Sequence, residues 1–266
     1  MDDPTNMARL ERRSSDAFQS GLGTRGDLIE RYRNRFTLES VRYHWNNVAN
    51  IYDGENRKFG YTHLQRFHEA LEHVQLLPAQ RILDVFTRTG NGIRSFKERC
   101  PGITMVGMEL SEGMLRLAQK KIPGNPFVQS SPHLFPFRDN VFDIVLSLET
   151  LEHVPSPLEF LLELHRIMKP GARLVMSLPP ATAEYTSVIS DFLSIGHGEG
   201  PHRFLSSAKV KEIVRIAGFN LLLHKGTVLL PVGPEVLKRW VDRIEHVFQG
   251  TFIAEIGIRQ FYICEK

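Results

Sequence analysis

The stretch ILDVFTRTGNGI, Ile82–Ile93, decides the fold. A short apolar run passes into a turn that holds two glycines, and an amphipathic segment follows. This order predicts a buried strand, a loop and a helix. Backbone N–H groups in such a loop can hold an anionic carboxylate or phosphate, so we expect a ligand to bind there.

Apolar runs of this kind recur along the chain. Parallel strands that are covered on both faces are almost continuously apolar, so each run predicts a buried strand. The five runs are RILDVF at 81–86, TMVGMEL at 104–110, FVQS at 127–130, FDIVLSL at 142–148 and ARLVMSL at 172–178. With the amphipathic segments between them, they predict a doubly wound α/β sheet, whose ligands bind beyond the carboxyl ends of the strands.

Three amphipathic segments have recognisable helix ends. Ser156 is expected to cap the helix before the fifth strand, Glu159 completes a capping box, and Pro170 with Gly171 ends this helix. A serine is also expected to cap each of the helices at 111–121 and 206–218.

The charge balance and the cysteine content indicate which partners and which cellular compartment to expect. Lys and Arg total 33 against 30 Asp and Glu, which gives no argument for a nucleic-acid partner. Cys100 and Cys264 form no C-x-x-C pair and argue against a disulfide framework. We recognise no signal peptide and no membrane span. We therefore expect a cytoplasmic protein with a small-molecule ligand, and leave its oligomeric state open.

The composition and the hydrophobic pattern of the sequence change twice along the chain. The first residues are polar, and the helical pattern that follows is interrupted by a predicted turn at YDGENRKFG, residues 52–60. The expected parts are a flexible arm at 1–25, a helical cap at 26–77 and an α/β domain at 78–266, in which 180–204 and 230–250 are possible substrate-cap elements.

Two acidic residues lie near the ends of the first two predicted strands. Glu109 follows Asp84 by 25 positions, where it could accept hydrogen bonds from a ribose diol. Taken singly, Asp84 could instead cap a helix and Glu109 could be a solvated strand end. Together they favour a nucleotide-like ligand, and their spacing does not say which nucleotide.

Residues 81–179 resemble the class I S-adenosylmethionine-dependent methyltransferases, particularly the group that includes the ubiquinone and menaquinone biosynthesis enzymes. The resemblance is carried, in order, by ILDVFTRTGNG, VGMELSEGMLRLAQKK, PFRDNVFDIVLSLETLEHVPSP and LLELHRIMKPGARLVMSLP. It implies a Rossmann-like, mostly parallel, seven-stranded sheet with N-terminal helices and an insert near the C-terminal strands. NLLLHKG from Asn220 and FYICEK from Phe261 would be the last two strands. It also implies methyl transfer from S-adenosylmethionine to a small-molecule acceptor.

The resemblance implies a set of cofactor-binding residues. They are Asp84, Phe86, Arg88, Thr89, Gly90, Gly92, Glu109, Leu110 and Ser131, with Met108 bordering the adenine. Phe86 and Arg88 replace glycines of the usual D-x-G-x-G-x-G, and Ser131 replaces an Asp of many relatives. We expect Phe86 to turn into the core and Arg88 to pair with the cofactor carboxylate. The alternative is a non-catalytic, methyltransferase-like binding or regulatory protein with a degenerate cofactor loop.

The segment LSLETLEHVP after the fourth strand supplies the catalytic candidates Glu149, Glu152 and His153. Methyl transfer is an in-line displacement, so a base helps when the acceptor is a hydroxyl or an amine. The same three residues could instead bind Mg²⁺ or Zn²⁺, or simply cap a turn and pack. His197 and His202 could complete such a metal site or act as bases.

The acceptor site is expected between the N-terminal helices and the insert. Trp45, Ile51 and Tyr52 would form one wall, and residues 180–204 the other. A quinone precursor, a sugar or an amino-acid derivative would suit this insert, and the atom that receives the methyl group stays open. A nicotinamide-dependent oxidoreductase would share the crevice but not the ETLEHVP and MKPGARL segments.

Overall fold

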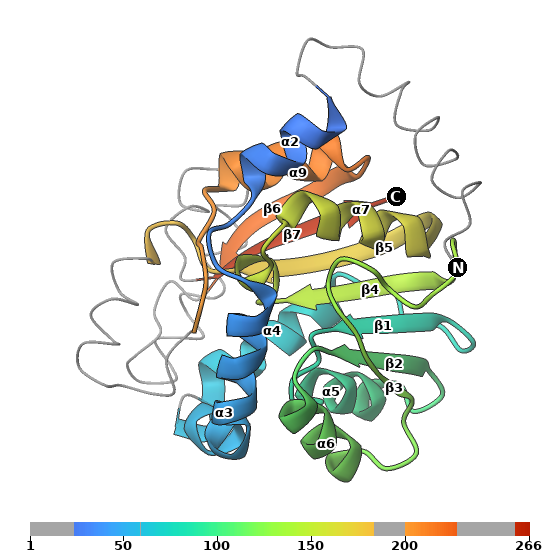
Figure 1. Ribbon diagram of the computed structural model, residues 1–266. Coiled ribbons are helices and arrows are strands. Elements are labelled where there is room, and N and C mark those ends of the chain that lie inside the picture. Colours follow the sequence, from blue (N-terminus) through green and yellow to red (C-terminus); the bar gives the residue numbers. More distant parts are fainter. Residues whose placement is uncertain (1–23, 59, 184–199, 228–258) are drawn as a thin grey trace, which may run out of the picture.

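The computed structural model describes residues 24–58, 60–183, 200–227 and 259–266. Seven strands form one sheet with helices on both faces (Figure 1). The strands are β1 Arg81–Val85, β2 Thr104–Glu109, β3 Phe127–Gln129, β4 Phe142–Leu148, β5 Met168–Leu178, β6 Asn220–Thr227 and β7 Arg259–Glu265. The helices are α2 Arg25–Tyr32, α3 Leu38–Lys58, α4 Gly60–Glu72, α5 Asn91–Arg99, α6 Glu112–Lys121, the short 3₁₀ helix η1 Leu151–His153, α7 Pro157–Ile167 and α9 Ser207–Ile216. The predicted seven-stranded α/β sheet is confirmed.

The strand order is β3-β2-β1-β4-β5-β7-β6. β1 to β5 pair in parallel, whereas β7 is antiparallel to both β5 and β6. From β1 the chain continues to β2 and β3 on one side, and then returns to β4 on the other. Ligands of such sheets bind where the strand order reverses, beyond the carboxyl ends of the strands. The loops after β1 and β4 meet at this place.

Apolar side chains form one layer on each face of the sheet. Trp45 of α3, Leu158 of α7 and Val210 of α9 belong to the first layer. Phe67 of α4 and Phe96 of α5 belong to the second. The N-terminal helices therefore share both apolar layers with the sheet, and this packing holds α3 and α4 against the loops at its carboxyl edge.

The predicted helix starts are confirmed at two serines and wrong in one detail at the third. The side chains of Ser111 and Ser206 accept the expected capping hydrogen bonds. Ser156 precedes α7 but makes no capping bond, because its backbone dihedrals (φ −127°, ψ 84°) lie outside the range typical of a cap. Glu159 completes no capping box, and its carboxylate lies 3.7 Å from the ring of His133.

Two predicted breaks lie elsewhere than expected. α7 ends at Ile167 and β5 begins at the next residue, so Pro170 and Gly171 belong to the strand and do not end the helix. The interruption predicted at 52–60 falls only at the end of this stretch, because α3 continues to Lys58 and α4 begins at Gly60. Burial of Tyr52 and the contacts of its neighbour Asp53 offset the cost of Gly54 in a helix, about 1 kcal/mol.

Several expectations concern residues outside the described part of the chain. They are nearly all of the arm at 1–25, the element at 230–250, most of the insert at 180–204, and His197. Within the described part, no helix is both long enough and apolar enough to cross a membrane.

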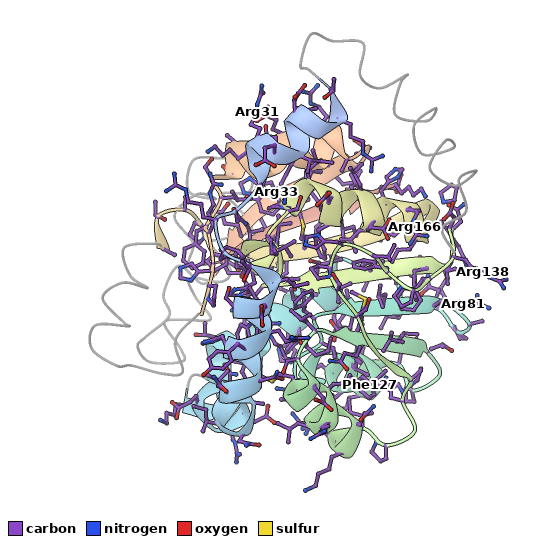
Figure 2. The ribbon with its side chains drawn as sticks, viewed as in Figure 1. Arg31, Arg33, Arg81, Phe127, Arg138 and Arg166 are labelled. Carbon is purple, nitrogen blue, oxygen red and sulfur yellow. The ribbon has the colours of Figure 1, made fainter. Side chains whose placement is uncertain are left out.

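The amino-terminal and carboxyl-terminal ends of the strands differ in how far their charged side chains are exposed. Arg166 lies at the amino-terminal edge, where it pairs with Glu163 and with the exposed Asp139 (Figure 2). At the carboxyl ends of the strands, Asp84, Arg88 and Glu109 are buried.

Candidate cofactor and active site

The loop between β1 and α5 has an unusual backbone. Phe86, Arg88 and Gly90 have φ angles of 54°, 53° and 82°, all in the left-handed region. Glycine adopts this region freely, whereas other residues lose roughly 1–2 kcal/mol there. The loop therefore keeps the conformation of a glycine-rich turn although two of its positions carry large side chains.

Phe86 has turned into the core. Its side chain is 3% exposed and belongs to the same apolar layer as Trp45. Burying an aromatic ring contributes about 1.5–3 kcal/mol, which offsets the backbone strain. The expectation that Phe86 is accommodated in this way is confirmed.

Arg88 is a buried cation. Its guanidinium carbon lies 3.9 Å from the ring centroid of Trp45 and 5.5 Å from that of Phe86. Nη2 donates a hydrogen bond of 3.3 Å to the main-chain oxygen of Glu149. Nη1 has no hydrogen-bond partner, and no carboxylate lies within 4 Å of the guanidinium, among the described residues.

Asp84 is buried below this loop. Its carboxylate accepts a hydrogen bond of 2.6 Å from the hydroxyl of Thr87, and burial raises its pKa to about 6. It does not cap a helix, because Gly90 is the residue before α5. A Cβ atom on Gly92 would lie 3.0 Å from Asp84 Oδ2 and 3.2 Å from the ring of Phe67, so the start of α5 has little room for a side chain.

Glu109 ends β2 and is fully buried. Its carboxylate accepts hydrogen bonds from the backbone N–H groups of Arg88 (2.8 Å), Leu110 (2.8 Å) and Ser111 (2.9 Å). The reading of this residue as a solvated strand end is wrong, because the loops after β1 and β2 fold over it. A carboxylate has about four acceptor positions, so about one remains for a further donor.

The remaining predicted cofactor residues line the same edge of the sheet. Met108 and Leu110 are buried. Ser131 is half-buried, and its hydroxyl accepts a hydrogen bond from the N–H of His133. Thr89 is fully buried and donates its hydroxyl to Asp53 of α3 (2.6 Å).

Asp53 belongs to a polar cluster that the sequence analysis missed. Its carboxylate also accepts hydrogen bonds from Asn91 (3.1 Å) and from Lys121 at the end of α6 (2.6 Å). Lys121 in turn donates to Thr89 (2.9 Å) and Asn91 (2.8 Å). No local pattern points to this cluster, because its four members come from three segments that are far apart in the sequence. It fixes α3 to the loop after β1.

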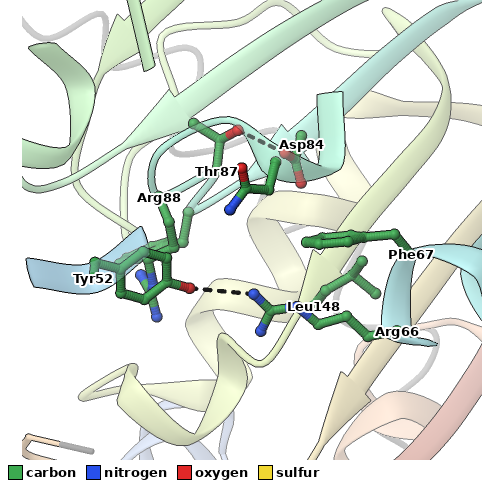
Figure 3. Close-up of a pocket in the computed structure, with 9 residues that line it drawn as sticks. Tyr52, Arg66, Phe67, Asp84, Thr87, Arg88 and Leu148 are labelled. Atoms are coloured by element: carbon green, nitrogen blue, oxygen red, sulfur yellow. Dashed lines mark hydrogen bonds between the residues drawn. The ribbon is translucent and has the colours of Figure 1, made fainter. Parts of the chain in front are cut away.

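A pocket opens between this loop and the N-terminal helices (Figure 3). It is lined by Tyr52, Arg66, Phe67, Asp84, Phe86, Thr87, Arg88, Asn91 and Leu148. Its free space is about 270 Å³ with its open mouth included, so the pocket is small and partly open to solvent. The pocket brings Asp84 and Arg88 together with Tyr52 of the predicted acceptor wall.

Glu149 lies directly after β4 and has a left-handed backbone (φ 52°). Its carboxylate pairs with Arg66 of α4 and with Arg259 of β7, the latter at 2.5 Å. Burial opposes the charged form, but Arg259 and Arg66 outweigh it and hold the pKa of Glu149 below its usual range. A carboxylate that is neutralised in this way is a weak base. Neither arginine belongs to a recognisable motif in the sequence.

His153 and Glu152 lie in η1 and are both buried. Burial, with Arg88 nearby, holds the pKa of His153 well below its usual range, so the ring is neutral. His153 Nδ1 is 3.0 Å from the main-chain oxygen of Pro201, which requires a proton on Nδ1 and leaves a lone pair on Nε2. Nε2 is 4.0 Å from Glu152 Oε1. The ring of Trp45 lies edge-on to His153, with centroids 5.3 Å apart.

The predicted metal site and acceptor wall are only partly assembled. Among the described residues, no three His, Cys, Asp or Glu side chains are arranged to hold a metal ion. His202 lies near His153, with ring centroids 6.4 Å apart, and stacks on Phe204. Trp45 and Tyr52 are buried beside the pocket, whereas Ile51 is 50% exposed on another face of α3 and does not join them.

Comparison with known proteins defines the class. The family described as "Methyltransferase domain" matches residues 83–176. A demethylmenaquinone methyltransferase of Thermus thermophilus is 31% identical over 213 residues, which cover 70% of this chain and 97% of that protein. A demethylmenaquinone methyltransferase of Renibacterium salmoninarum is 28% identical over 158 residues, and the match covers 58% of this chain and 66%, just under two thirds, of that protein.

A solved structure agrees at the level of the fold. It is described as an S-adenosylmethionine-dependent methyltransferase, possible histamine N-methyltransferase, from Thermotoga maritima. The two structures superpose with a TM-score of 0.63 at 21% sequence identity, and the match covers 85% of this chain and 99% of that one. The fold is therefore that of the class I methyltransferases. The chain belongs to the S-adenosylmethionine-dependent methyltransferases of class I, in the group that includes the ubiquinone and menaquinone biosynthesis enzymes.

Proposed function

We propose that this chain transfers a methyl group from S-adenosylmethionine to a small-molecule acceptor. Besides family membership, one observation carries the proposal. Asp84 and Glu109 are buried acids at the carboxyl ends of neighbouring strands, on either side of a left-handed loop, and neither forms an ion pair with a described residue. Buried carboxylates without a cationic partner are costly and favour a ligand that donates to them.

The residues present fit this cofactor. Asp84 suits an ammonium group, because a bound cation would offset the burial that raises its pKa. Glu109 keeps about one acceptor position for a ribose hydroxyl. The assignments of Thr89, Gly90, Gly92, Leu110 and Ser131 to the cofactor belong to the same proposal and rest on the family resemblance.

The bound cofactor supplies an electrophilic methyl group on a sulfonium. The chain has to align the acceptor, exclude water and remove a proton where the acceptor carries one. We assign the proton to His153, because its Nε2 carries a lone pair that is not tied to arginines as the carboxylate of Glu149 is, even though burial also lowers the pKa of this ring. Glu152 lies beside it and can stabilise the imidazolium. Glu149 is better suited to hold Arg66 and Arg259 in place than to act as a base.

The acceptor is proposed to be a quinol-like aromatic molecule. The two relatives described above are named for demethylmenaquinone, and here the pocket is lined by the aromatic side chains of Tyr52, Phe67 and Phe86. A small-molecule acceptor also suits the nearly balanced charge of the chain. A cytoplasmic location belongs to the proposal, since Cys100 and Cys264 both carry free thiols.

The proposal is tested with the Glu109→Gln variant. Glutamine keeps one acceptor oxygen for the backbone N–H groups but removes the charge, so we expect the affinity for S-adenosylmethionine to fall about tenfold. Calorimetry measures this affinity, and formation of S-adenosylhomocysteine in the presence of a naphthoquinol measures turnover. Thermal unfolding of the variant controls for its fold. An unchanged affinity in a folded variant would contradict the ribose assignment.

The rival function is a non-catalytic, methyltransferase-like module. Two observations favour it, namely the small pocket and the Arg88 side chain that lines it. This rival predicts that neither S-adenosylmethionine nor S-adenosylhomocysteine binds the wild-type chain, and the same titration decides between the two functions.

A further inference from the structure

Arg88 differs from the other buried arginines at the carboxyl edge of the sheet. Arg66 and Arg259 both pair with Glu149. Arg88 is equally buried, at 7% exposure, yet it faces two aromatic rings and a main-chain oxygen and has no carboxylate within 4 Å among the described residues. A buried charge without a counter-charge is costly, so such a group favours an anionic ligand.

The guanidinium of Arg88 is held in place with one donor free. The ring of Trp45 covers one face of the group, and Nη2 is bound by the oxygen of Glu149. Nη1 is buried and has no partner in the described part of the chain, although Arg88 lines the pocket. The backbone N–H of Arg88 is engaged by Glu109, so this residue can serve a ligand only through its side chain.

Asp84 supplies the opposite charge in the same pocket (Figure 3). The two side chains form no ion pair with each other, and among the described residues the carboxylate of Asp84 accepts a hydrogen bond only from the hydroxyl of Thr87. One unpaired anion and one unpaired cation in a single pocket are complementary to a zwitterion, the charge state of a free amino-acid group.

We propose that Arg88 binds the α-carboxylate of the amino-acid part of the cofactor while Asp84 binds its α-ammonium group. The inference rests on the proposed function and adds to it. At a loop position where the family has glycine, this chain has an arginine side chain that supplies a charged donor. Arg88 would thereby determine affinity for the amino-acid end of the ligand, and leave the adenosine end to Glu109.

The test compares two ligands that differ only at the amino-acid end. S-Adenosylhomocysteine carries the carboxylate and the ammonium group, whereas 5′-methylthioadenosine has the same adenosine and a thioether but neither charge. Calorimetry with the full chain measures both affinities for the wild type, Arg88→Gln and Arg88→Lys. Arg94→Gln is the matched control, because Arg94 is an exposed arginine of α5 that pairs with Glu98.

In Arg88→Gln we expect about a ten- to hundredfold loss of affinity for S-adenosylhomocysteine, with the affinity for 5′-methylthioadenosine changed less than about twofold. Arg88→Lys keeps the charge and should retain part of the preference, and Arg94→Gln should retain all of it. An equal loss for both ligands in Arg88→Gln, or tighter binding of S-adenosylhomocysteine, would overturn the inference. Unchanged binding of both ligands would overturn it as well and leave the proposed function standing. Failure of both ligands to bind the wild type would overturn the proposed function itself.

Discussion

The loops after β1 and β4 follow neighbouring strands of the sheet, yet they differ in whether their charged side chains form ion pairs. Each holds a residue in the left-handed region, Arg88 in the first and Glu149 in the second. After β4, Glu149 is neutralised by two arginines. After β1, Asp84 and Arg88 are buried without ionic partners among the described residues. The ion pairs of Glu149 hold two buried arginines in place, whereas unpaired buried charges are retained at a cost that a ligand can offset.

The largest expected effect comes from breaking the ion pairs of Glu149. Glu149→Ala leaves Arg66 and Arg259 buried without their counter-charge, so we expect the free energy of unfolding to fall by about 3–5 kcal/mol. Urea denaturation measures it. Glu98→Ala is the control, because it removes an exposed partner of Arg94 and should cost less than about 1 kcal/mol. A loss in Glu149→Ala as small as that of the control, together with loss of methyl transfer, would instead identify Glu149 as the base.

A smaller effect of opposite sign on the free energy of unfolding is expected when Asp84, in the loop after β1, is changed. The pKa of Asp84 is raised from 3.8 to about 6 by burial, so its ionised form destabilises the fold. Asp84→Asn should therefore stabilise the chain by roughly 3 kcal/mol above pH 6, while weakening its affinity for S-adenosylmethionine. This gain should shrink as the pH falls from 6 and vanish below about 4, where the carboxyl group is protonated in both states. Denaturation across this pH range measures it, and a destabilised Asn variant at pH 8 would contradict the account of Asp84.

Local sequence patterns predicted most of the fold. The five apolar runs, the serine caps at Ser111 and Ser206 and the position of the loop after β1 depend on neighbours within a few residues. The misplaced features depend on distant contacts. α3 continues through Gly54 because Tyr52 is buried and Asp53 binds Lys121, and the helix before β5 ends early because Met168 already pairs with Phe142.

The candidate site also combines features that the sequence predicts with features that depend on distant residues. The positions of Asp84 and Glu109 at the ends of two strands follow from residue type and spacing, and the inward turn of Phe86 was expected from the family resemblance. The state of Glu149 does not, because its partners Arg66 and Arg259 are 83 and 110 positions away. A carboxylate that looks like a base in the sequence is therefore neutralised in the structure by residues that carry no recognisable motif.

The most direct test of the cofactor assignment is a calorimetric titration of the full wild-type chain with S-adenosylmethionine at pH 7.5, repeated at pH 5. Saturable binding at one site is expected at pH 7.5, with weaker binding at pH 5, because protonation of Asp84 removes the partner of the ammonium group. The absence of binding at pH 7.5 would contradict the interpretation of the loop after β1 as a working cofactor site.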